Sequence, residues 1–220
     1  MSFKSIDIGI AMKGKMLFVL FLPIVIQAQS VKNGVKARAL IEKAYAANAA
    51  NSYQEALTYF IQADSLSSAV FTSDDYNNMG GSYFKLGEYR QAIAMSKRSL
   101  LLDSNNIHAF LNMGIAYGML DSHLLAIECY QKVVLMNPTQ TQAYFNMALS
   151  YQQLKEKAKA LEVYQKIIEI EPDNAKAFIN MGIVYGELGN YKKLVECYQQ
   201  AARLGNKVAQ DYLSKSGHGW

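Results

Sequence analysis

Apolar residues recur at intervals of three and four along most of the chain, and residues 141–174 show this pattern most clearly. Their apolar side chains form two groups, with a short polar stretch around Lys155 between them. The groups are Tyr144, Met147, Ala148 and Tyr151, then Leu161, Tyr164, Ile167 and Ile168. This spacing places each group on one face of an α-helix. The segment therefore predicts two amphipathic helices joined by a short turn.

The two-helix pattern repeats with a period of 34 residues. Its clearest marker is a run of Asn, Met and a small residue, which begins at Asn78, Asn112, Asn146 and Asn180. The same period relates Tyr83, Tyr117, Tyr151 and Tyr185, then Ala92, Ala126 and Ala160, and finally Pro138 and Pro172. A period of this length indicates a stack of equivalent units, because one helix pair cannot bury its own apolar face.

Features within each unit predict how its two helices are joined and packed. The turn between them is short enough only for an antiparallel hairpin, and it is marked by Gly87, Asp121, Lys155 or Gly189. Small residues in the first helix are expected to face small residues in the second, so that the helices approach closely. They are Gly80, Gly114, Ala148 and Gly182, facing Ala92, Ala126 and Ala160. Most of the Tyr and Met residues occupy the helical packing period and are expected in the core.

This arrangement of aromatic, small, Tyr, Ala and Pro positions resembles the tetratricopeptide repeat (TPR) family. The resemblance covers residues 73–106, 107–140, 141–174 and 175–208, with a divergent copy at 37–70. It implies an all-α fold, a right-handed solenoid of antiparallel helix pairs. Asn206 stands where the period would place Pro and can cap a final helix over residues 207–215. We therefore expect a C-terminal capping helix within 206–216, followed by a flexible tail at 217–220.

Two copies depart from the pattern. In the first, Ala44 and Ala47 replace the expected small residue and Tyr, and two residues are inserted before the next copy, so looser packing is expected. In the last, Leu194 stands where Ala is expected, and the sequence offers no reason for it.

The N-terminal residues carry a different pattern. A short basic segment from Met12 precedes an apolar run at 16–26, and a small residue, Ala28, precedes the polar stretch that follows. This order is typical of a secretory signal peptide, so residues 1–28 are assigned to one, with Met12 as an alternative start and 29–36 as a linker. The protein is then exported, periplasmic or secreted. The alternative is that residues 16–26 stay as a membrane anchor.

Charge and chemistry narrow the function further. The formal net charge of the whole chain is +4, but residues 1–28 carry three lysines against one aspartate, so the repeats are nearly balanced and no nucleic-acid partner is expected. Cys129 and Cys197 lie two periods apart, too far for a disulfide between stacked helix pairs, and are predicted to be free thiols. His108, His123 and His218 lack metal-ligand spacing. We expect no enzyme activity, cofactor, metal or small-molecule substrate.

The family resemblance implies a binding site on the first helices, which line the concave face of such solenoids and commonly receive peptides of partner proteins. The inward positions hold one amide stripe and apolar flanks: Asn78, Asn112, Asn146 and Asn180, with Leu111, Phe145, Ile179, Ile115, Leu149 and Ile183. Asn side chains can match the N–H and carbonyl groups of a peptide backbone. They can equally bond to a neighbouring helix, and both alternatives stay open here.

The apolar flanks are expected to form an exposed patch, which monomers rarely keep without a use. The predicted function is a non-catalytic protein–protein interaction adaptor that binds a peptide or helix of a partner protein. The alternative is a structural, homo-oligomeric envelope protein with this groove buried in the assembly. A membrane is a partner only if residues 16–26 remain attached.

Overall fold

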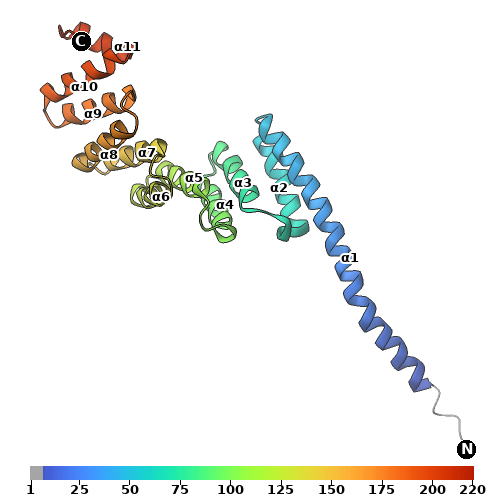
Figure 1. Ribbon diagram of the computed structural model, residues 1–220. Helices are drawn as coiled ribbons and strands as arrows, with labels where there is room; N and C mark the ends of the chain where they lie inside the picture. The colour runs from blue at the N-terminus through green and yellow to red at the C-terminus, as the bar shows by residue number, and fades with distance from the viewer. Residues whose placement is uncertain (1–6) are drawn as a thin grey trace, which may run out of the picture.

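The computed structural model describes the chain from Asp7 to Trp220, with side chains described from Ile26 onward (Figure 1). Residues 7–220 form α-helices and one short 3-10 helix, without a strand. The first six elements are α1 (Asp7–Ala49), α2 (Tyr53–Ser67), η1 (Ser68–Val70), α3 (Ser73–Lys85), α4 (Tyr89–Leu102) and α5 (Ile107–Met119). The others are α6 (His123–Met136), α7 (Thr141–Gln153), α8 (Lys157–Ile170), α9 (Ala175–Glu187), α10 (Tyr191–Arg203) and α11 (Lys207–Lys215).

The helices form successive antiparallel pairs, stacked into an elongated, curved body (Figure 1). Each of the four windows predicted between residues 73 and 208 contains one pair, from α3 and α4 to α9 and α10. Helix α1 and helix α11 lie at opposite ends of the body, and α1 extends well beyond its partner α2 (Figure 1). The structure is therefore the all-α solenoid that the 34-residue period predicts.

The turns inside the pairs share one backbone conformation. The second residue after the first helix has a positive φ in every unit, and non-glycine residues adopt it at Asn51 (59°), Asp121 (55°) and Lys155 (61°). A left-handed residue at this place ends a helix and reverses the chain within a few residues. This explains why Gly, Asn, Asp and Lys alternate at one position of the period.

Glycines allow the two helices of a unit to approach closely. A Cβ at Gly80 would lie 3.3 Å from the carbonyl oxygen of Ala92, as expected. At Gly114, however, the nearest atoms belong to Cys129 and Tyr130, about one helical turn beyond Ala126. Cys197 and Tyr198 take this role at Gly182. The expected pairing with Ala is thus right for the first of these units, whereas in the other two the glycine makes room for a tyrosine ring.

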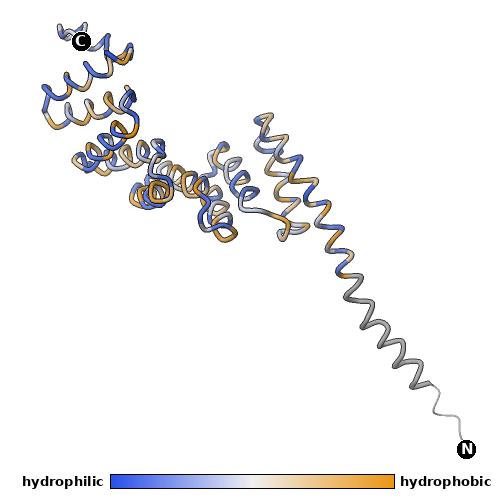
Figure 2. Tube along the Cα trace, viewed as in Figure 1, coloured by the Kyte–Doolittle hydropathy of each residue, from blue (hydrophilic) through white to orange (hydrophobic). Residues whose placement is uncertain are grey.

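The core runs through the stack as a series of overlapping apolar clusters. Each complete unit contributes a Met from its first helix, at most 9% exposed: Met79, Met113, Met147 and Met181. Clusters cross the boundaries between units, since Met147 of α7 belongs to the group centred on Tyr130 of α6, and Val184 of α9 to the group around Tyr164 of α8. Hydrophobic and hydrophilic residues alternate along every helix of the stack (Figure 2), as amphipathic helices require.

The structure describes only part of the N-terminal segment that the sequence assigns to a signal peptide and a linker. Residues 1–6 of the predicted signal peptide, and the side chains of 7–25, lie outside the described residues. Residues 29–36, expected to be a linker, belong instead to α1, which continues through Asn33 and Gly34 even though both are weak helix formers. From Ile26 onward, the first buried side chain is that of Ala37. No helix among the described residues is both long and apolar enough to cross a membrane.

The first unit joins the rest of the stack through a polar centre on α3. The Asp75 side chain is only 2% exposed and accepts hydrogen bonds from Arg38 Nη1 (3.0 Å) and Tyr45 Oη (2.9 Å) of α1. It also accepts from the backbone N–H of Thr72 (2.8 Å), which completes the N-terminal cap of α3. The divergent copy is therefore attached by an ion pair as well as by apolar packing.

The C-terminal end is covered as predicted. Helix α11 spans Lys207–Lys215, and the Asn206 side chain accepts from the backbone N–H of Ala209 (3.2 Å). Leu213 is fully buried, and Tyr212 lies against the Tyr198 ring with 4.6 Å between the centroids. The last four residues are exposed, but they are hydrogen-bonded to the stack. The backbone N–H of His218 donates to the Leu213 carbonyl oxygen (2.9 Å), and Gln199 Nε2 donates to the Gly219 carbonyl oxygen (2.6 Å).

Candidate functional site

The four asparagines at 34-residue intervals, called the asparagine ladder below, occupy equivalent places on successive first helices. Asn78 lies on α3, Asn112 on α5, Asn146 on α7 and Asn180 on α9. All four are half-buried. The spacing places one amide per unit along the face formed by these helices.

Three of the four ladder amides donate hydrogen bonds within the protein. Asn112 Nδ2 donates to Asn77 Oδ1 on α3 (2.9 Å). Asn78 Nδ2 donates to Tyr45 Oη (3.2 Å) and to the carbonyl oxygen of Asp74 (2.8 Å). Asn180 Nδ2 donates to the carbonyl oxygen of Lys176 (2.8 Å). Bonds to neighbouring helices therefore exist at Asn78 and Asn112, as one of the two sequence-based alternatives expects.

The acceptor side of the ladder remains available. Among residues 26–220, no donor is hydrogen-bonded to the side-chain oxygen of any of the four asparagines. The Asn146 amide forms no hydrogen bond at all within that part of the chain. Each ladder oxygen can thus accept an N–H from outside, and an extended peptide backbone carries such donors at regular intervals.

The apolar flanks are less exposed than the sequence suggests. Leu111 is only 6% exposed and packs in the core beside Ala143 and Met147 of the next unit, so its assignment to an exposed patch is wrong. Its place precedes the ladder Asn by one residue, which turns the side chain towards the following helix pair. Phe145, at the same place one unit later, is half-buried and lies edge-on to Tyr164, with 5.8 Å between the centroids.

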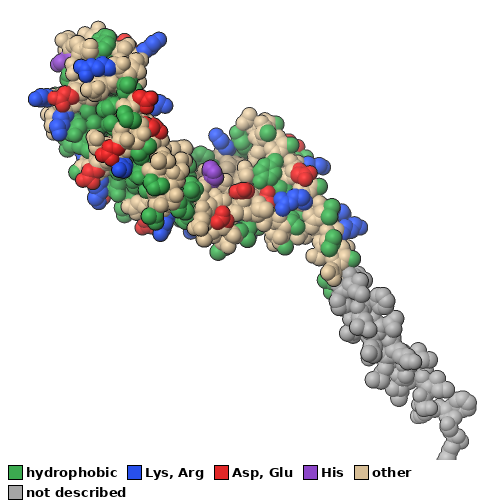
Figure 3. Space-filling view, in the orientation of Figure 1, with side chains coloured by type: hydrophobic (Ala, Val, Ile, Leu, Met, Phe, Trp, Pro, Cys, Tyr) green, Lys and Arg blue, Asp and Glu red, His purple; other side chains and the backbone are tan. Residues whose placement is uncertain are grey.

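The remaining flank residues form a narrower apolar surface. Ile115 and Ile179 are half-buried, while Leu149 and Ile183 are each 39% exposed. Leu149 and Ile183 lie on α7 and α9, one period apart. Exposed hydrophobic side chains also gather over the C-terminal half of the stack in Figure 3, with acidic and basic side chains among them. The apolar part of the face is therefore concentrated on α7 and α9.

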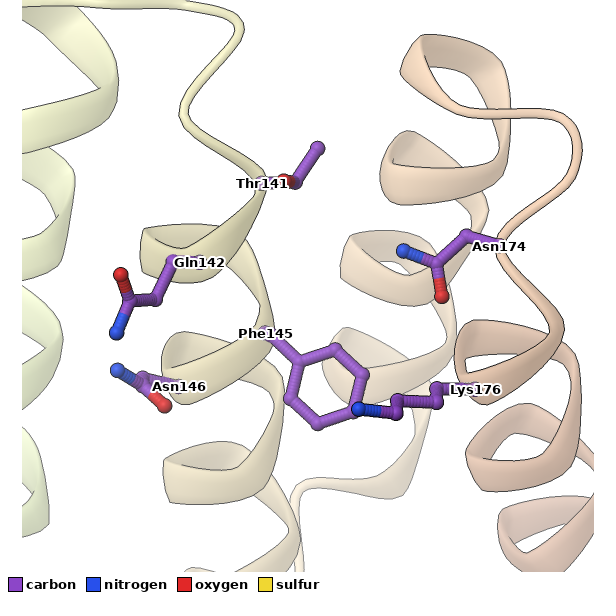
Figure 4. A pocket seen from close by; sticks show the side chains of 6 residues that line it. All are labelled: Thr141, Gln142, Phe145, Asn146, Asn174 and Lys176. Carbon is purple, nitrogen blue, oxygen red and sulfur yellow. The ribbon is translucent and has the colours of Figure 1, made fainter.

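A cavity of about 250 Å³, called the α7–α9 pocket below, lies beside this surface. It is lined by Thr141, Gln142, Phe145, Asn146, Asn174 and Lys176. In Figure 4 the Lys176 side chain reaches from α9 towards the Phe145 ring, whereas Gln142 and Asn146 lie on the other side of that ring. The pocket thus combines an aromatic wall with amides on one side and a cation on the other.

The charged groups at the pocket are Glu171, next to the lining, and Lys176, within it. Glu171 accepts from Thr141 Oγ1 (2.8 Å) at one oxygen and from Asn174 Nδ2 (2.7 Å) at the other. Within residues 26–220, Lys176 forms no ion pair. The pocket lining contains no acidic side chain. The lining is therefore polar, with both donors and acceptors, and Lys176 supplies its one positive charge.

Four lining residues are absent from the set predicted from the sequence: Thr141, Gln142, Asn174 and Lys176. A signal for Gln142 is present in the sequence, because it stands one period before Lys176 and both are second residues of a first helix. Thr141 and Asn174 take part through their contacts with Glu171, and no periodic pattern marks those contacts.

Other chemistry-bearing groups are dispersed. Among the described residues there is no cluster of three or more His, Cys, Asp or Glu side chains that could hold a metal ion. Cys129 and Cys197 are buried free thiols, and burial raises the pKa of each to about 11. A thiol in this state reacts slowly, because the thiolate is the nucleophile. These residues belong to the packing of the stack.

Three models of the tetratricopeptide repeat match the sequence, over residues 76–106, 141–174 and 163–199. No curated protein sequence matches the chain. Among solved structures, the MamA protein superimposes with a TM-score of 0.72 at 21% identity, covering 85% of this chain and 98% of that one. MamA from Desulfovibrio magneticus, residues 41 to the end, gives 0.72 at 22% identity, with 78% and 96% covered.

A third similar structure is YrrB, a TPR protein with an unusual peptide-binding site. Its TM-score is 0.67 at 24% identity, with 80% of this chain and 90% of that chain covered. At these sequence identities, the structural similarity shows a shared fold. The peptide-binding site is a property of YrrB.

Proposed function

Because this chain is a tetratricopeptide repeat protein, we propose that it is a non-catalytic adaptor that binds a peptide or helix of a partner protein on the face formed by α3, α5, α7 and α9. Stacked repeats place equivalent side chains in a row and so build extended binding surfaces. The peptide-binding site of YrrB, which has the same fold, is in line with this proposal.

The asparagine ladder is the observation that carries the proposal. Its four side-chain oxygens accept no hydrogen bond within residues 26–220, and Asn146 borders the α7–α9 pocket. Acceptors at regular intervals suit the N–H groups of a peptide backbone whatever its sequence. Leu149 and Ile183 add apolar contact area next to them. Binding then combines hydrogen bonds to the backbone with burial of apolar side chains.

The test is affinity capture from a native envelope extract, comparing the wild-type chain with the Asn112→Ala/Asn146→Ala variant and identifying captured proteins by mass spectrometry. We expect a partner retained by the wild type to be lost from the variant. Asn105→Ala is the matched control, because Asn105 is exposed on the loop between α4 and α5, outside the ladder. Equal capture by the double variant and the control would contradict a role for the ladder.

Self-association is the competing outcome. If the same face is buried between copies of the chain, the wild-type protein will recover mainly itself. Light scattering will then show a mass that rises with concentration and falls in the double variant.

We also propose export, with removal of residues 1–28. The basic segment, the apolar run and the small residue before Gln29 support this assignment. Removal takes nothing from the described core, which begins at Ala37. Intact mass measured on protein from cell fractions tests the proposal. The mass of residues 29–220 outside the cytoplasm is expected, and a full-length chain in the membrane fraction would favour an anchor instead.

A further inference from the structure

One position on the proposed binding face changes charge systematically along the stack. The second residue of each first helix is Asp74 in α3, His108 in α5, Gln142 in α7 and Lys176 in α9. These residues are one period apart, so they occupy equivalent places on the face that carries the asparagine ladder. The last two line the α7–α9 pocket. One end of the face is therefore acidic at this position and the other end basic.

The basic end has the features of a seat for a negative charge. Lys176 forms no ion pair within residues 26–220, and the nearby Glu171 carboxylate already accepts one hydrogen bond at each oxygen. Lys176 also lies in the first turn of α9, where the helix dipole favours an anion. The Phe145 ring forms one wall of the pocket and offers an apolar surface to the methylene groups of a side chain bound there.

The pocket also separates two kinds of contact. Asn146 and Gln142 lie on one side of the Phe145 ring, and Lys176 approaches it from the other (Figure 4). A peptide strand lying over the ladder would meet the amides with its backbone. A side chain that projects past the ring would meet the ammonium group of Lys176.

We propose that the α7–α9 pocket seats the carboxylate side chain of an Asp or Glu residue in a bound peptide, with Lys176 as its counter-ion. This inference rests on the proposed peptide-binding function and names the chemistry of the ligand. A single cation in a pocket without acids matches one carboxylate, whereas an acidic tail would need several cations. Asp74 at the far end of the face disfavours a second acidic residue there, so the position of the acid sets the direction in which the peptide binds.

A peptide library tests the proposal. The full chain is immobilised and exposed to random dodecapeptides that are acetylated at the N-terminus and amidated at the C-terminus, so that only side chains carry carboxylates. We expect enrichment of Asp or Glu at one position relative to the ladder-binding segment. For a partly exposed ion pair, Lys176→Gln should reduce this enrichment about three- to fivefold, and the enrichment should weaken as salt is raised.

Two further variants make the result specific. Lys176→Glu should select Lys or Arg at the same peptide position. Lys132→Gln removes the same charge from an exposed site on α6, outside the pocket, and should leave the selection unchanged. Circular dichroism checks that all variants remain helical, which is expected because both lysines are exposed.

A second library with free C-termini separates the two sources of a carboxylate. If acids are enriched only through the terminal carboxylate, the inference about a side chain is overturned. Retained peptides without any acidic preference, or a preference unchanged by Lys176→Gln, also overturn it while leaving peptide binding intact. If the wild-type chain retains no peptide in either library, the proposed function fails together with the inference.

Discussion

At the scale of single residues, the size of one side chain decides how closely two helices pack. Leu194 replaces the Ala that other units carry at the start of the second helix, and its Cδ1 lies 2.6 Å from where a Cβ of residue 186 would be. Residue 186 is Gly, as is residue 118 at the same place two units earlier, where nothing lies within 4 Å of an added Cβ. The glycine on α9 thus leaves the space that Leu194 of α10 fills, whereas the equivalent space beside Gly118 stays open.

Replacing Gly114 with Ala is expected to destabilise the protein. The new Cβ would lie 2.6 Å from Tyr130 Cε1 and 3.1 Å from Cys129 Cβ, and Tyr130 is only 2% exposed, so the core must shift. Overpacking should lower the free energy of unfolding by about 1–2 kcal/mol, after allowing for the better helix propensity of Ala.

Gly118→Ala is the matched control for this change in the same helix. No atom of a facing helix lies within 4 Å of the methyl group that this substitution would add, so only the propensity gain of roughly 0.5 kcal/mol is expected. Urea denaturation measures both variants. Equal free energies of unfolding for the two variants would show that the core accommodates a Cβ at residue 114 without strain.

At the scale of helices, the joints between units differ in chemistry. The central units meet through apolar clusters, such as the one that links α5, α6 and α7. The first unit meets α3 through Asp75, whose carboxylate binds Arg38 and Tyr45 of α1. The last unit is closed by α11, which buries Leu213 and leaves its polar residues outside. A finite stack needs such an end, because an open apolar face would aggregate.

Asp75→Asn should weaken the joint between α1 and α3. Asn keeps the volume of the side chain but loses the charge that pairs with Arg38. Its NH2 group replaces one of the two oxygens, so either the bond from Tyr45 or those from Arg38 and Thr72 are lost. Removing a charged partner of several hydrogen bonds should lower the free energy of unfolding by about 2 kcal/mol. Asp173→Asn, at an exposed site, should change it by less than about 0.5 kcal/mol. Similar urea midpoints for the two variants would contradict this account.

Leu213→Ala should loosen the C-terminal end selectively. Leu213 is fully buried against α10, so truncation creates a cavity and should cost about 2–3 kcal/mol locally. Hydrogen exchange should then accelerate in α10 and α11 more than in α3 and α4, because repeats contact only their neighbours. Val208→Ala, 66% exposed on the same helix, is the control. Uniform acceleration along the chain would indicate a single cooperative unit instead.

At the scale of the whole molecule, burial of ionisable groups links stability to pH. Burial raises the pKa values of the Cys129 and Cys197 thiols to about 11, from an ordinary value of 9.0. Burial also raises the pKa values of Tyr130 and Tyr164. All four groups are neutral in the folded protein over a range where they ionise in the unfolded chain. The unfolded state therefore binds fewer protons in alkaline solution.

The stability of the protein should accordingly fall as the pH rises above about 9. Each thiol can contribute a slope of up to about 1.4 kcal/mol per pH unit until the folded thiol itself ionises. Urea unfolding between about pH 8 and about pH 10 measures the slope. In the Cys129→Ala/Cys197→Ala variant the slope should be smaller, since the tyrosines ionise at higher pH. An unchanged slope would assign the effect to other groups.

The periodic features of the fold follow from the sequence. The helix pairs, their turns and the cap over 207–215 depend on residues close together in the chain, such as Lys155 at a left-handed turn and Asn206 at a helix start. Local spacing and backbone preference determine these features, and the helix pairs and turns recur several times with the 34-residue period. The continuation of α1 through 29–36 does not follow from the sequence pattern, because the Asn33-Gly34 pair in that stretch favours a turn.

Only the tertiary structure decided what each position on the binding face does. Leu111 and Phe145 share a place in the repeat, yet Leu111 is buried by the following unit while Phe145 lines a pocket. The ladder amides likewise share a place, but the donors of Asn112 bind a neighbouring helix and Asn146 remains unpaired within the described residues. These differences depend on the side chains that adjacent units present to each other, which lie about one period away in sequence. A repeat pattern alone treats such positions as equivalent.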